Sequence, residues 1–190
     1  MAWHMMNAWE EDGALHIDLC QQEAPAFPSP DGRLAAEKLQ RQFLTRWSIT
    51  PSEGQVSVRR LSETVCEYPR IDERRCGRPY RFGFVAAEGG PGTGDMPHRA
   101  IGRIDHRTGE MRLWRAPSGQ AVSEPVFAAR PGCDDEGVGY LLFTVFDERR
   151  NASHLAIADA ERVEDGPLAR AHLDHRVPAG FHGSFVLART

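Results

Sequence analysis

The sequence predicts an all-β protein, and three observations support this prediction. Residues 14–19 alternate apolar and polar side chains directly after the turn-forming pair Asp12-Gly13, as a half-buried strand does. Residues 100–105 and 110–114 flank a short segment that ends in Gly109, which is typical of a β-hairpin with glycine where φ is positive. Short strand-like segments recur at roughly ten-residue spacing, which favours an antiparallel sandwich, barrel or propeller.

The remaining elements follow from local patterns. Residues 139–146 form a nearly continuous apolar run of strand length between charged segments, and two more strands are predicted at residues 155–158 and 169–173. Asp31 is a suitable N-cap for a short helix that continues toward Phe43 through the apolar residues Leu34, Ala35, Ala36 and Leu39. Residues 22–32 are rich in proline and residues 88–97 in glycine, so both are predicted to be long loops.

Length and composition predict one globular domain over residues 1–190. Hydrophobic residues make up 41% and charged residues 26%, a balance that permits a buried core. The longest apolar run, near residues 140–146, is far shorter than the about 20 residues of a membrane span, and the first six residues do not resemble a secretory signal. Because the four cysteines form no C-x-x-C pair, we expect reduced thiols and a cytoplasmic location.

The charge pattern argues against nucleic-acid binding. The net charge is −4, and the basic residues, all arginine apart from Lys38, are interleaved with acids. The glycine-rich segment 89–94 lacks the Lys-Ser/Thr of a P-loop. His172 and His175 are three residues apart, which on a strand places them on opposite faces and makes them a poor metal pair.

Two histidines and two glutamates lie in unusual surroundings. His4, Glu67, Glu124 and His182 are flanked by aromatic, apolar or proline residues, in segments 3–11, 66–74, 123–127 and 177–185. A lone histidine in such surroundings is usually a hydrogen-bonded core residue, whereas an unpaired buried carboxylate is costly. The histidines and the glutamates both have partners if each imidazole binds a metal through one nitrogen and donates the N–H of its other nitrogen to a carboxylate.

The same four segments resemble the carotenoid cleavage oxygenase family, which includes carotenoid, apocarotenoid and lignostilbene oxygenases and the retinal pigment epithelium isomerase. The resemblance covers essentially the whole chain. Each segment matches one family motif, and the four motifs occur in the family's order: His-x-x-Asn-Ala-Trp-Glu from His4, Glu-Tyr-Pro-Arg from Glu67, Ser-Glu-Pro-Val-Phe around Glu124, and Pro-x-Gly-Phe-His-Gly around His182.

The resemblance implies the C-terminal portion of a seven-bladed β-propeller, with mostly antiparallel strands, long loops and a short helix. A complete propeller of this kind has about seven blades with about four strands each, and this chain supplies roughly half of it. The segments that carry the family's first two iron histidines, and the first of its three glutamates, have no match here. We therefore expect a partial propeller domain that requires a missing N-terminal half or another chain.

The resemblance also implies the chemistry. Four neutral imidazoles hold Fe(II), and His4 and His182 correspond to two of these ligands. Glu67 is expected to orient His4 and Glu124 to orient His182, so the two imidazoles converge on one point. The expected reaction is dioxygenase cleavage of a conjugated C=C bond of a carotenoid or apocarotenoid by O2 to carbonyl products. No acid/base residue or covalent nucleophile is predicted.

Alternatives remain at this stage. The substrate could be a stilbene, or the chain could be an inactive fragment or a non-catalytic propeller that serves as an interaction module. The expected partners are an apolar polyene or stilbene and O2, with peripheral membrane contact possible for the full-length enzyme. An upstream reading frame with two more histidine motifs would favour the enzyme.

Overall fold

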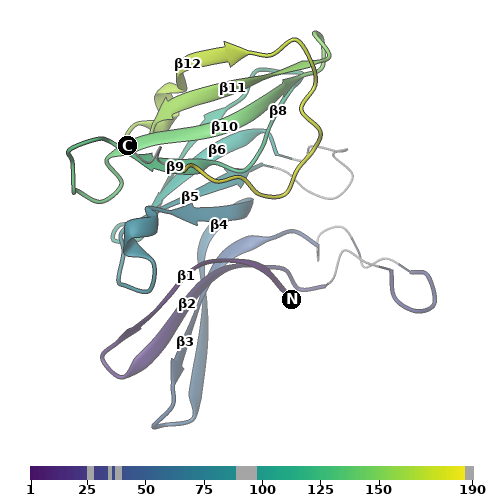
Figure 1. Ribbon diagram of the computed structural model, residues 1–190. Coiled ribbons are helices and arrows are strands. Elements are labelled where there is room, and N and C mark those ends of the chain that lie inside the picture. The colour runs from purple at the N-terminus through teal and green to yellow at the C-terminus, as the bar shows by residue number, and fades with distance from the viewer. Residues whose placement is uncertain (25–27, 34–35, 37–39, 89–97, 187–190) are drawn as a thin grey trace.

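The computed structural model describes residues 1–24, 28–33, 36, 40–88 and 98–186, and most of these residues form antiparallel β-structure (Figure 1). Two short 3-10 turns, η2 (Glu73–Arg75) and η3 (Val163–Asp165), are the helical elements of this part of the chain. Its strands are β1 (Ala2–Glu11), β2 (Ala14–Gln21), β3 (Phe43–Thr50), β4 (Gln55–Ile71), β5 (Phe82–Ala87), β6 (Ala100–Asp105), β7 (Glu110–Arg115), β8 (Gln120–Val122), β9 (Val126–Ala129), β10 (Gly139–Asp147), β11 (Ala152–Asp159) and β12 (Pro167–His172).

The strands form three groups that resemble neighbouring propeller blades (Figure 1). The first group contains β1, β2, β3 and the start of β4, and the second contains the end of β4, β5, β6 and β7. Strand β4 links these groups because residues 55–60 pair with β3 whereas residues 66–71 pair with β5. In the third group β10 pairs with β11, β8 and β9, and β12 completes the outer edge.

The strands predicted from the sequence are confirmed. Residues 14–19 lie in β2, the predicted hairpin is formed by β6 and β7, and the three C-terminal segments form β10, β11 and β12. Gly109 closes the hairpin with φ at 77°, and its amide donates to the Asp105 carbonyl at 2.7 Å. This left-handed conformation is the reason that the turn favours glycine.

Two other predictions have different outcomes. The helix expected from Asp31 falls largely on residues 34–35 and 37–39, which lie outside the described residues, as do residues 89–97 of the glycine-rich loop. The continuation of that helix to Phe43 is wrong, because Phe43 begins β3 and pairs with Gln21 of β2. Sheet pairing takes precedence over helix propensity at this position.

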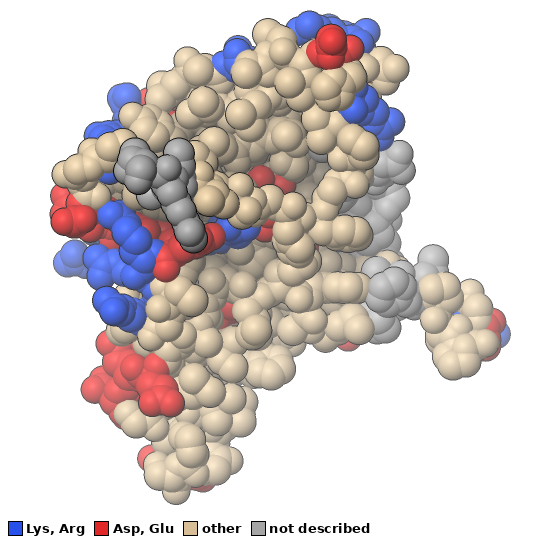
Figure 2. Space-filling model, in the orientation of Figure 1, with Lys and Arg blue, Asp and Glu red and all other residues tan. Residues whose placement is uncertain are grey.

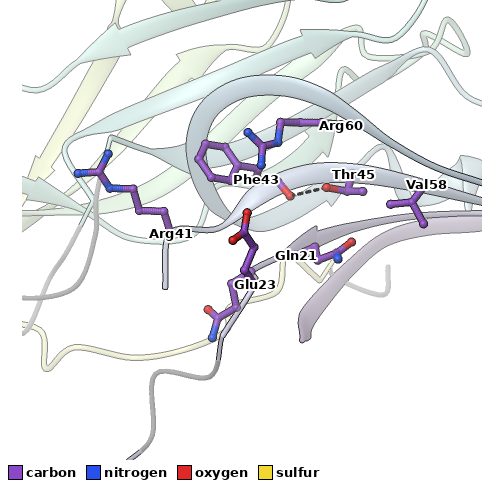
Figure 3. Close-up of a pocket in the computed structure, with 8 residues that line it drawn as sticks. Gln21, Glu23, Arg41, Phe43, Thr45, Val58 and Arg60 are labelled. Atoms are coloured by element: carbon purple, nitrogen blue, oxygen red, sulfur yellow. Dashed lines mark hydrogen bonds between the residues drawn. The ribbon is translucent and has the colours of Figure 1, made fainter. Parts of the chain in front are cut away.

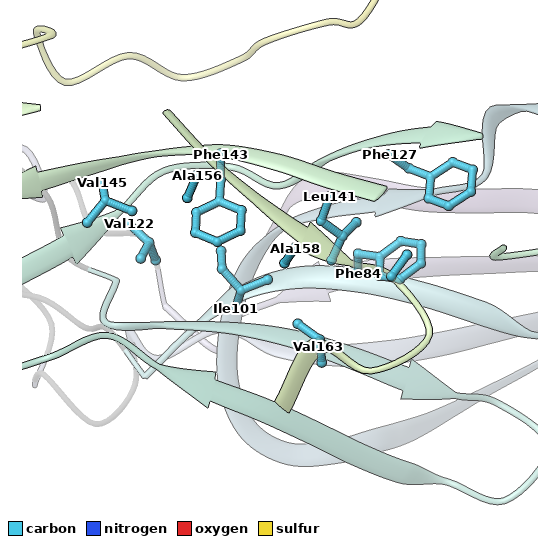
Figure 4. Packing of buried hydrophobic residues seen from close by; sticks show 11 residues of the cluster. Phe84, Ile101, Val122, Phe127, Leu141, Phe143, Val145, Ala156, Ala158 and Val163 are labelled. Carbon is cyan, nitrogen blue, oxygen red and sulfur yellow. The ribbon is translucent and has the colours of Figure 1, made fainter. Parts of the chain in front are cut away.

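A core of interlocking apolar side chains joins the second and third groups (Figure 4). Phe84 of β5 stacks on Phe127 of β9, with ring centroids 5.5 Å apart, and Ile101 of β6 packs in the same cluster as Leu141 and Phe143 of β10. Each fully buried side chain of this size contributes about 1.5–3 kcal/mol. A second cluster, which includes Met6, Leu44, Cys66, Val85 and Ile104, joins the first group to the second.

A buried polar network reinforces the junction between the first two groups. Asp18 of β2 is fully buried and accepts two hydrogen bonds at 2.7 Å from Arg46 of β3. The Tyr80 hydroxyl donates to the same carboxylate at 2.5 Å, and the His106 ring packs on Tyr80 with centroids 4.6 Å apart. The Asp18 carboxylate therefore has the partners that a buried charge needs.

Charges of both signs are interspersed on the face shown in Figure 2. Arginine side chains lie next to aspartate and glutamate, and much of this face is uncharged. Among the described residues of this face, there is no continuous basic surface of the kind that tracks nucleic-acid phosphates. Within the described ranges, the structure also contains no helix long and apolar enough to cross a membrane.

Candidate metal centre

His4 lies on β1, where the pairing with β2 is irregular. The β1–β2 ladder shifts register between Ala2 and Met5, so the strand departs from regular alternation at His4. The imidazole is partly buried, with 27% of the side chain exposed. Its Nδ1 lies 2.7 Å from Oε2 of Glu67, a residue 63 positions away in the sequence.

Glu67 reaches His4 because β4 contains a bulge at this point. The β4–β5 ladder shifts register between Glu67 and Arg70, and Tyr68 has φ at 52°, a left-handed conformation that is uncommon for an aromatic residue. The Tyr68 ring lies against the His4 ring, with centroids 5.4 Å apart. The bulge thus allows two consecutive residues of one strand to contact the same histidine.

The Glu67 carboxylate is buried and only partly paired. Its Oε2 interacts with His4 Nδ1 and accepts a hydrogen bond from the Tyr68 amide, whereas Oε1 is buried and lacks a partner in the described residues. Burial raises the pKa of Glu67, and the hydrogen bonds from Tyr68 and His4 oppose this effect.

The second histidine–glutamate pair joins the C-terminal segment to the third group of strands. Glu124 lies between β8 and β9 and is buried, and its Oε1 is 3.2 Å from Nδ1 of His182. Its Oε2 accepts a hydrogen bond from the Gly183 amide at 2.7 Å. His182 itself lies in a segment without regular secondary structure that follows β12 and turns back along the third group (Figure 1).

The structure brings the four residues of the two pairs together. The His4 and His182 rings meet edge to face, with centroids 4.7 Å apart and an interplanar angle of 82°. Because both Nδ1 atoms face carboxylates, the tautomer with the proton on Nδ1 is favoured, and each Nε2 keeps a lone pair. This donor set suits a borderline metal such as iron, so the residues fit two positions of an Fe(II) site.

These two imidazoles are an incomplete ligand set. No cluster of three or more histidine, cysteine, aspartate or glutamate side chains with metal-binding geometry occurs within the described ranges. The other histidine pair considered from the sequence lies elsewhere: His172 Nδ1 is 2.9 Å from an Arg150 nitrogen, and His175 Nδ1 is 2.7 Å from Asp174.

Three neighbours of the pairs were not predicted from the sequence. Tyr68 packs on both histidines, with its ring centroid 6.0 Å from that of His182. His98 packs against Tyr68 at 5.4 Å, and burial lowers the pKa of His98 to about 4. Arg70 forms an ion pair with Glu124 at 3.2 Å. Tyr68 and Arg70 belong to the recognised Glu-Tyr-Pro-Arg segment, which is the only sequence signal for them.

An apolar cavity of about 370 Å³ lies beside His182 and Glu124. It is an open pocket between strand residues such as Leu142 and Phe143 and the C-terminal segment with Pro178 and Phe181. Apolar walls with a few polar groups at one side are typical of sites for apolar small molecules.

A second pocket lies apart from the histidine–glutamate pairs (Figure 3). Its volume is about 270 Å³, and it is formed by side chains of β2, β3, β4 and the adjacent segments. Arg60 covers the Phe43 ring here, with its guanidinium carbon 4.0 Å from the ring centroid. None of the four predicted site residues lines this pocket, so it is not part of the candidate metal centre.

Comparisons with known proteins agree with the motifs. The chain is 35% identical over 204 residues to lignostilbene-α,β-dioxygenase isozyme III of Sphingomonas paucimobilis, covering 97% of this chain and 41% of that protein. It is 32% identical over 189 residues to apocarotenoid-15,15′-oxygenase of Synechocystis, covering 97% of this chain and 38% of that protein. The chain therefore spans about two fifths of the length of these curated relatives.

A solved structure shows the same fold. The crystal structure of the cobalt-substituted Synechocystis oxygenase superposes with a TM-score of 0.88 at 27% identity, covering 99% of this chain and 40% of that chain. The model of the RPE65 family, described as retinal pigment epithelial membrane protein, matches residues 1–187. The chain belongs to this family, the carotenoid cleavage oxygenases that its motifs resemble, and its strand groups are part of that family's propeller fold.

Proposed function

We propose that this chain supplies two iron ligands, His4 and His182, to a non-haem Fe(II) dioxygenase that cleaves a conjugated C=C bond. The observation that carries this proposal is the edge-to-face approach of the two imidazoles at 4.7 Å, each with Nδ1 directed at a buried glutamate. The segments that carry the family's other two histidine ligands have no match in these 190 residues.

The two glutamates act on the histidines. Glu67 accepts a hydrogen bond from Nδ1–H of His4, and Glu124 accepts one from Nδ1–H of His182. These bonds fix the tautomer and orientation of each ring and leave each Nε2 for the metal. A bound Fe(II) would supply the activation of dioxygen, and the overall reaction would convert one C=C bond and one O2 into two carbonyl groups without an external reductant. The chain's own residues are not required as acid, base or nucleophile.

The proposed substrate is a carotenoid or apocarotenoid. A cavity with apolar walls such as Leu142, Phe143 and Phe181 beside His182 is suited to an apolar polyene. A stilbene is the second candidate, because the relative with 35% identity is named a lignostilbene dioxygenase.

The test uses the complete protein, loaded with Fe(II). We expect oxygen-dependent formation of two carbonyl products from either an apocarotenoid or a hydroxystilbene, and ¹⁸O from ¹⁸O2 in both products. His182→Ala is expected to abolish turnover and reduce iron content. An iron-loaded protein that cleaves neither alkene would favour the non-catalytic interaction module.

A further inference from the structure

We propose that Arg70 is a positioning residue of the metal centre, which fixes His182 by joining its glutamate to the backbone beside it. This inference rests on the proposed role of His182 as a metal ligand. Arg70 forms no hydrogen bond with His4 or His182. Its proposed effect on the metal therefore passes through its contacts with Glu124 and Gly183.

The guanidinium of Arg70 reaches three acceptors. Nη1 donates to the Gly183 carbonyl at 2.9 Å and lies 3.2 Å from Oε1 of Glu124. Nη2 donates to Oε1 of Glu73 at 2.6 Å, which anchors the other side of the fork. Only 17% of the Arg70 side chain and 5% of the Glu124 side chain are exposed, so this ion pair is shielded from solvent, whereas Glu73 is exposed.

These contacts hold the segment that carries His182. Residues 173–186 form no strand, and 54% of the His182 side chain is exposed, so packing alone does not fix the ring. The residue that follows is held on both sides: the Gly183 amide donates to Glu124 and its carbonyl accepts from Arg70. Arg70 thereby closes a ring of contacts through Gly183, Glu124 and His182.

Arg70 also compensates the charge of Glu124. The Glu124 side chain is 5% exposed, and a buried carboxylate is costly without a cation or hydrogen bonds. The guanidinium lies 3.2 Å from the same Oε1 atom that faces Nδ1 of His182, so Arg70 and His182 share one carboxylate oxygen. Lysine cannot reproduce this arrangement in full, because a single ammonium lacks the planar fork of arginine.

Arg74 provides a matched control four residues along the chain. Its guanidinium also forms several hydrogen bonds, to both carboxylate oxygens of Asp72 at 2.9 and 2.7 Å and to the Cys133 carbonyl at 2.8 Å. None of these partners contacts a histidine of the candidate centre. Removing Arg74 therefore reports the general cost of losing a multiply bonded arginine.

The experiment compares Arg70→Met, Arg70→Lys and Arg74→Met in the complete protein. Co(II) affinity is measured from the visible absorption of the metal, and amide exchange of residues 179–186 is measured in the metal-free protein. We expect Arg70→Met to weaken Co(II) binding about 10–100-fold, as loss of an outer partner of a metal ligand does, and to accelerate exchange at Gly183. Arg70→Lys should be intermediate, and Arg74→Met should lower the melting temperature without changing Co(II) affinity.

Two results would overturn the inference. One is unchanged affinity and exchange in Arg70→Met, and the other is an equal loss of affinity in Arg74→Met. If Arg70→Met does not fold, Arg70→Lys carries the same comparison. His182→Ala separates the two proposals. If that change leaves Co(II) affinity intact, the ligand role of His182 is wrong and the inference about Arg70 fails with it. If His182→Ala lowers the affinity but Arg70→Met does not, the inference about Arg70 alone is wrong.

Discussion

The two glutamates that contact the histidines, Glu67 and Glu124, differ in their other hydrogen bonds. Both oxygens of Glu124 have partners, and Arg70 lies beside it. Only one oxygen of Glu67 is paired in the described residues, and burial raises the pKa of this carboxyl. An amide that replaces the Glu67 carboxylate therefore has different neighbours from one that replaces the Glu124 carboxylate.

This difference predicts unequal effects of Glu67→Gln and Glu124→Gln. Both should weaken iron retention about 10–100-fold, the usual cost of removing an outer partner of a ligand. The effect should be larger for Glu124→Gln, because its amide nitrogen would face the Gly183 N–H or the Arg70 guanidinium. At Glu67 the amide nitrogen can take the unpaired Oε1 position.

Iron content after dialysis of the complete protein measures this effect. Glu88→Gln is the control, since Glu88 pairs with Arg115 rather than with a histidine. Equal iron content in all three variants would mean that Glu67 and Glu124 are merely structural.

At the scale of strands, the β9–β10 ladder predicts a cost for one glycine substitution. A Cβ on Gly139 would lie 2.3 Å from the Ala128 carbonyl oxygen and 2.9 Å from the Phe127 ring. Gly139→Ala must therefore push the backbone of β9 away from β10, and we expect a loss of about 1–3 kcal/mol in the free energy of unfolding. Chemical denaturation measures this loss. Gly180→Ala is the control, because its Cβ would meet nothing within 4 Å, and an equal loss there would contradict the steric explanation.

Strands that are buried on one face could be predicted from the sequence. Residues 14–19 and 139–146 are both strands. In β10 buried and half-buried side chains alternate, whereas in β2 the buried side chains include Asp18 as well as Leu19. Strand β4 was not predicted, although Val56 and Val58 alternate with Ser57 and Arg59, and its first half is exposed on both faces.

The candidate site was predictable only through motifs. No local pattern indicates that His4 pairs with a residue 63 positions away, and the resemblance supplied that pairing. The contacts of Arg70 and the left-handed backbone of Tyr68 depend on the bulge in β4 and on the path of the C-terminal segment. These are tertiary features, so neither appears in sequence periodicity.

At the scale of the whole molecule, the buried network between the first two strand groups predicts a dependence of stability on pH. Burial lowers the pKa of His106 from an ordinary value of 6.5 to about 4, although Asp18 opposes the shift. The unfolded chain thus binds a proton between these pH values that the folded chain does not. We therefore expect the contribution of His106 to the free energy of unfolding to be fully present above pH 6.5. It should fall by about 3 kcal/mol as the pH drops to 4.

His106→Phe keeps an aromatic ring on Tyr80 but removes this proton site. The free energy of unfolding, measured with urea, should therefore decrease less between pH 7 and 4.5 in the variant than in the wild type. His175→Phe is the control at an exposed histidine. Identical pH dependence of His106→Phe and the wild type would exclude His106 as a source of the acid sensitivity.

The last prediction concerns these 190 residues expressed by themselves. His4 and His182 are the proposed counterparts of two of the family's four ligands, and metal affinity depends on ligand number and on a preformed site. Large apolar side chains next to both histidines are also exposed: Trp3 and Met5 on β1, and Phe181 and Phe185 on the C-terminal segment. Such surface marks an interface or an aggregation liability.

We therefore expect the isolated chain to bind Fe(II) weakly, to self-associate and to cleave no alkene. The complete protein, by contrast, is expected to cleave the alkene. Anaerobic Fe(II) dialysis followed by metal analysis gives the stoichiometry, size-exclusion chromatography gives the association state, and an oxygen-dependent carbonyl assay gives turnover. Trp3→Ser with Phe181→Ser should reduce self-association without restoring iron binding, since the ligand number is unchanged. Stable iron binding with turnover would contradict the prediction, and one iron per two chains would mean that a second copy completes the set of four histidines.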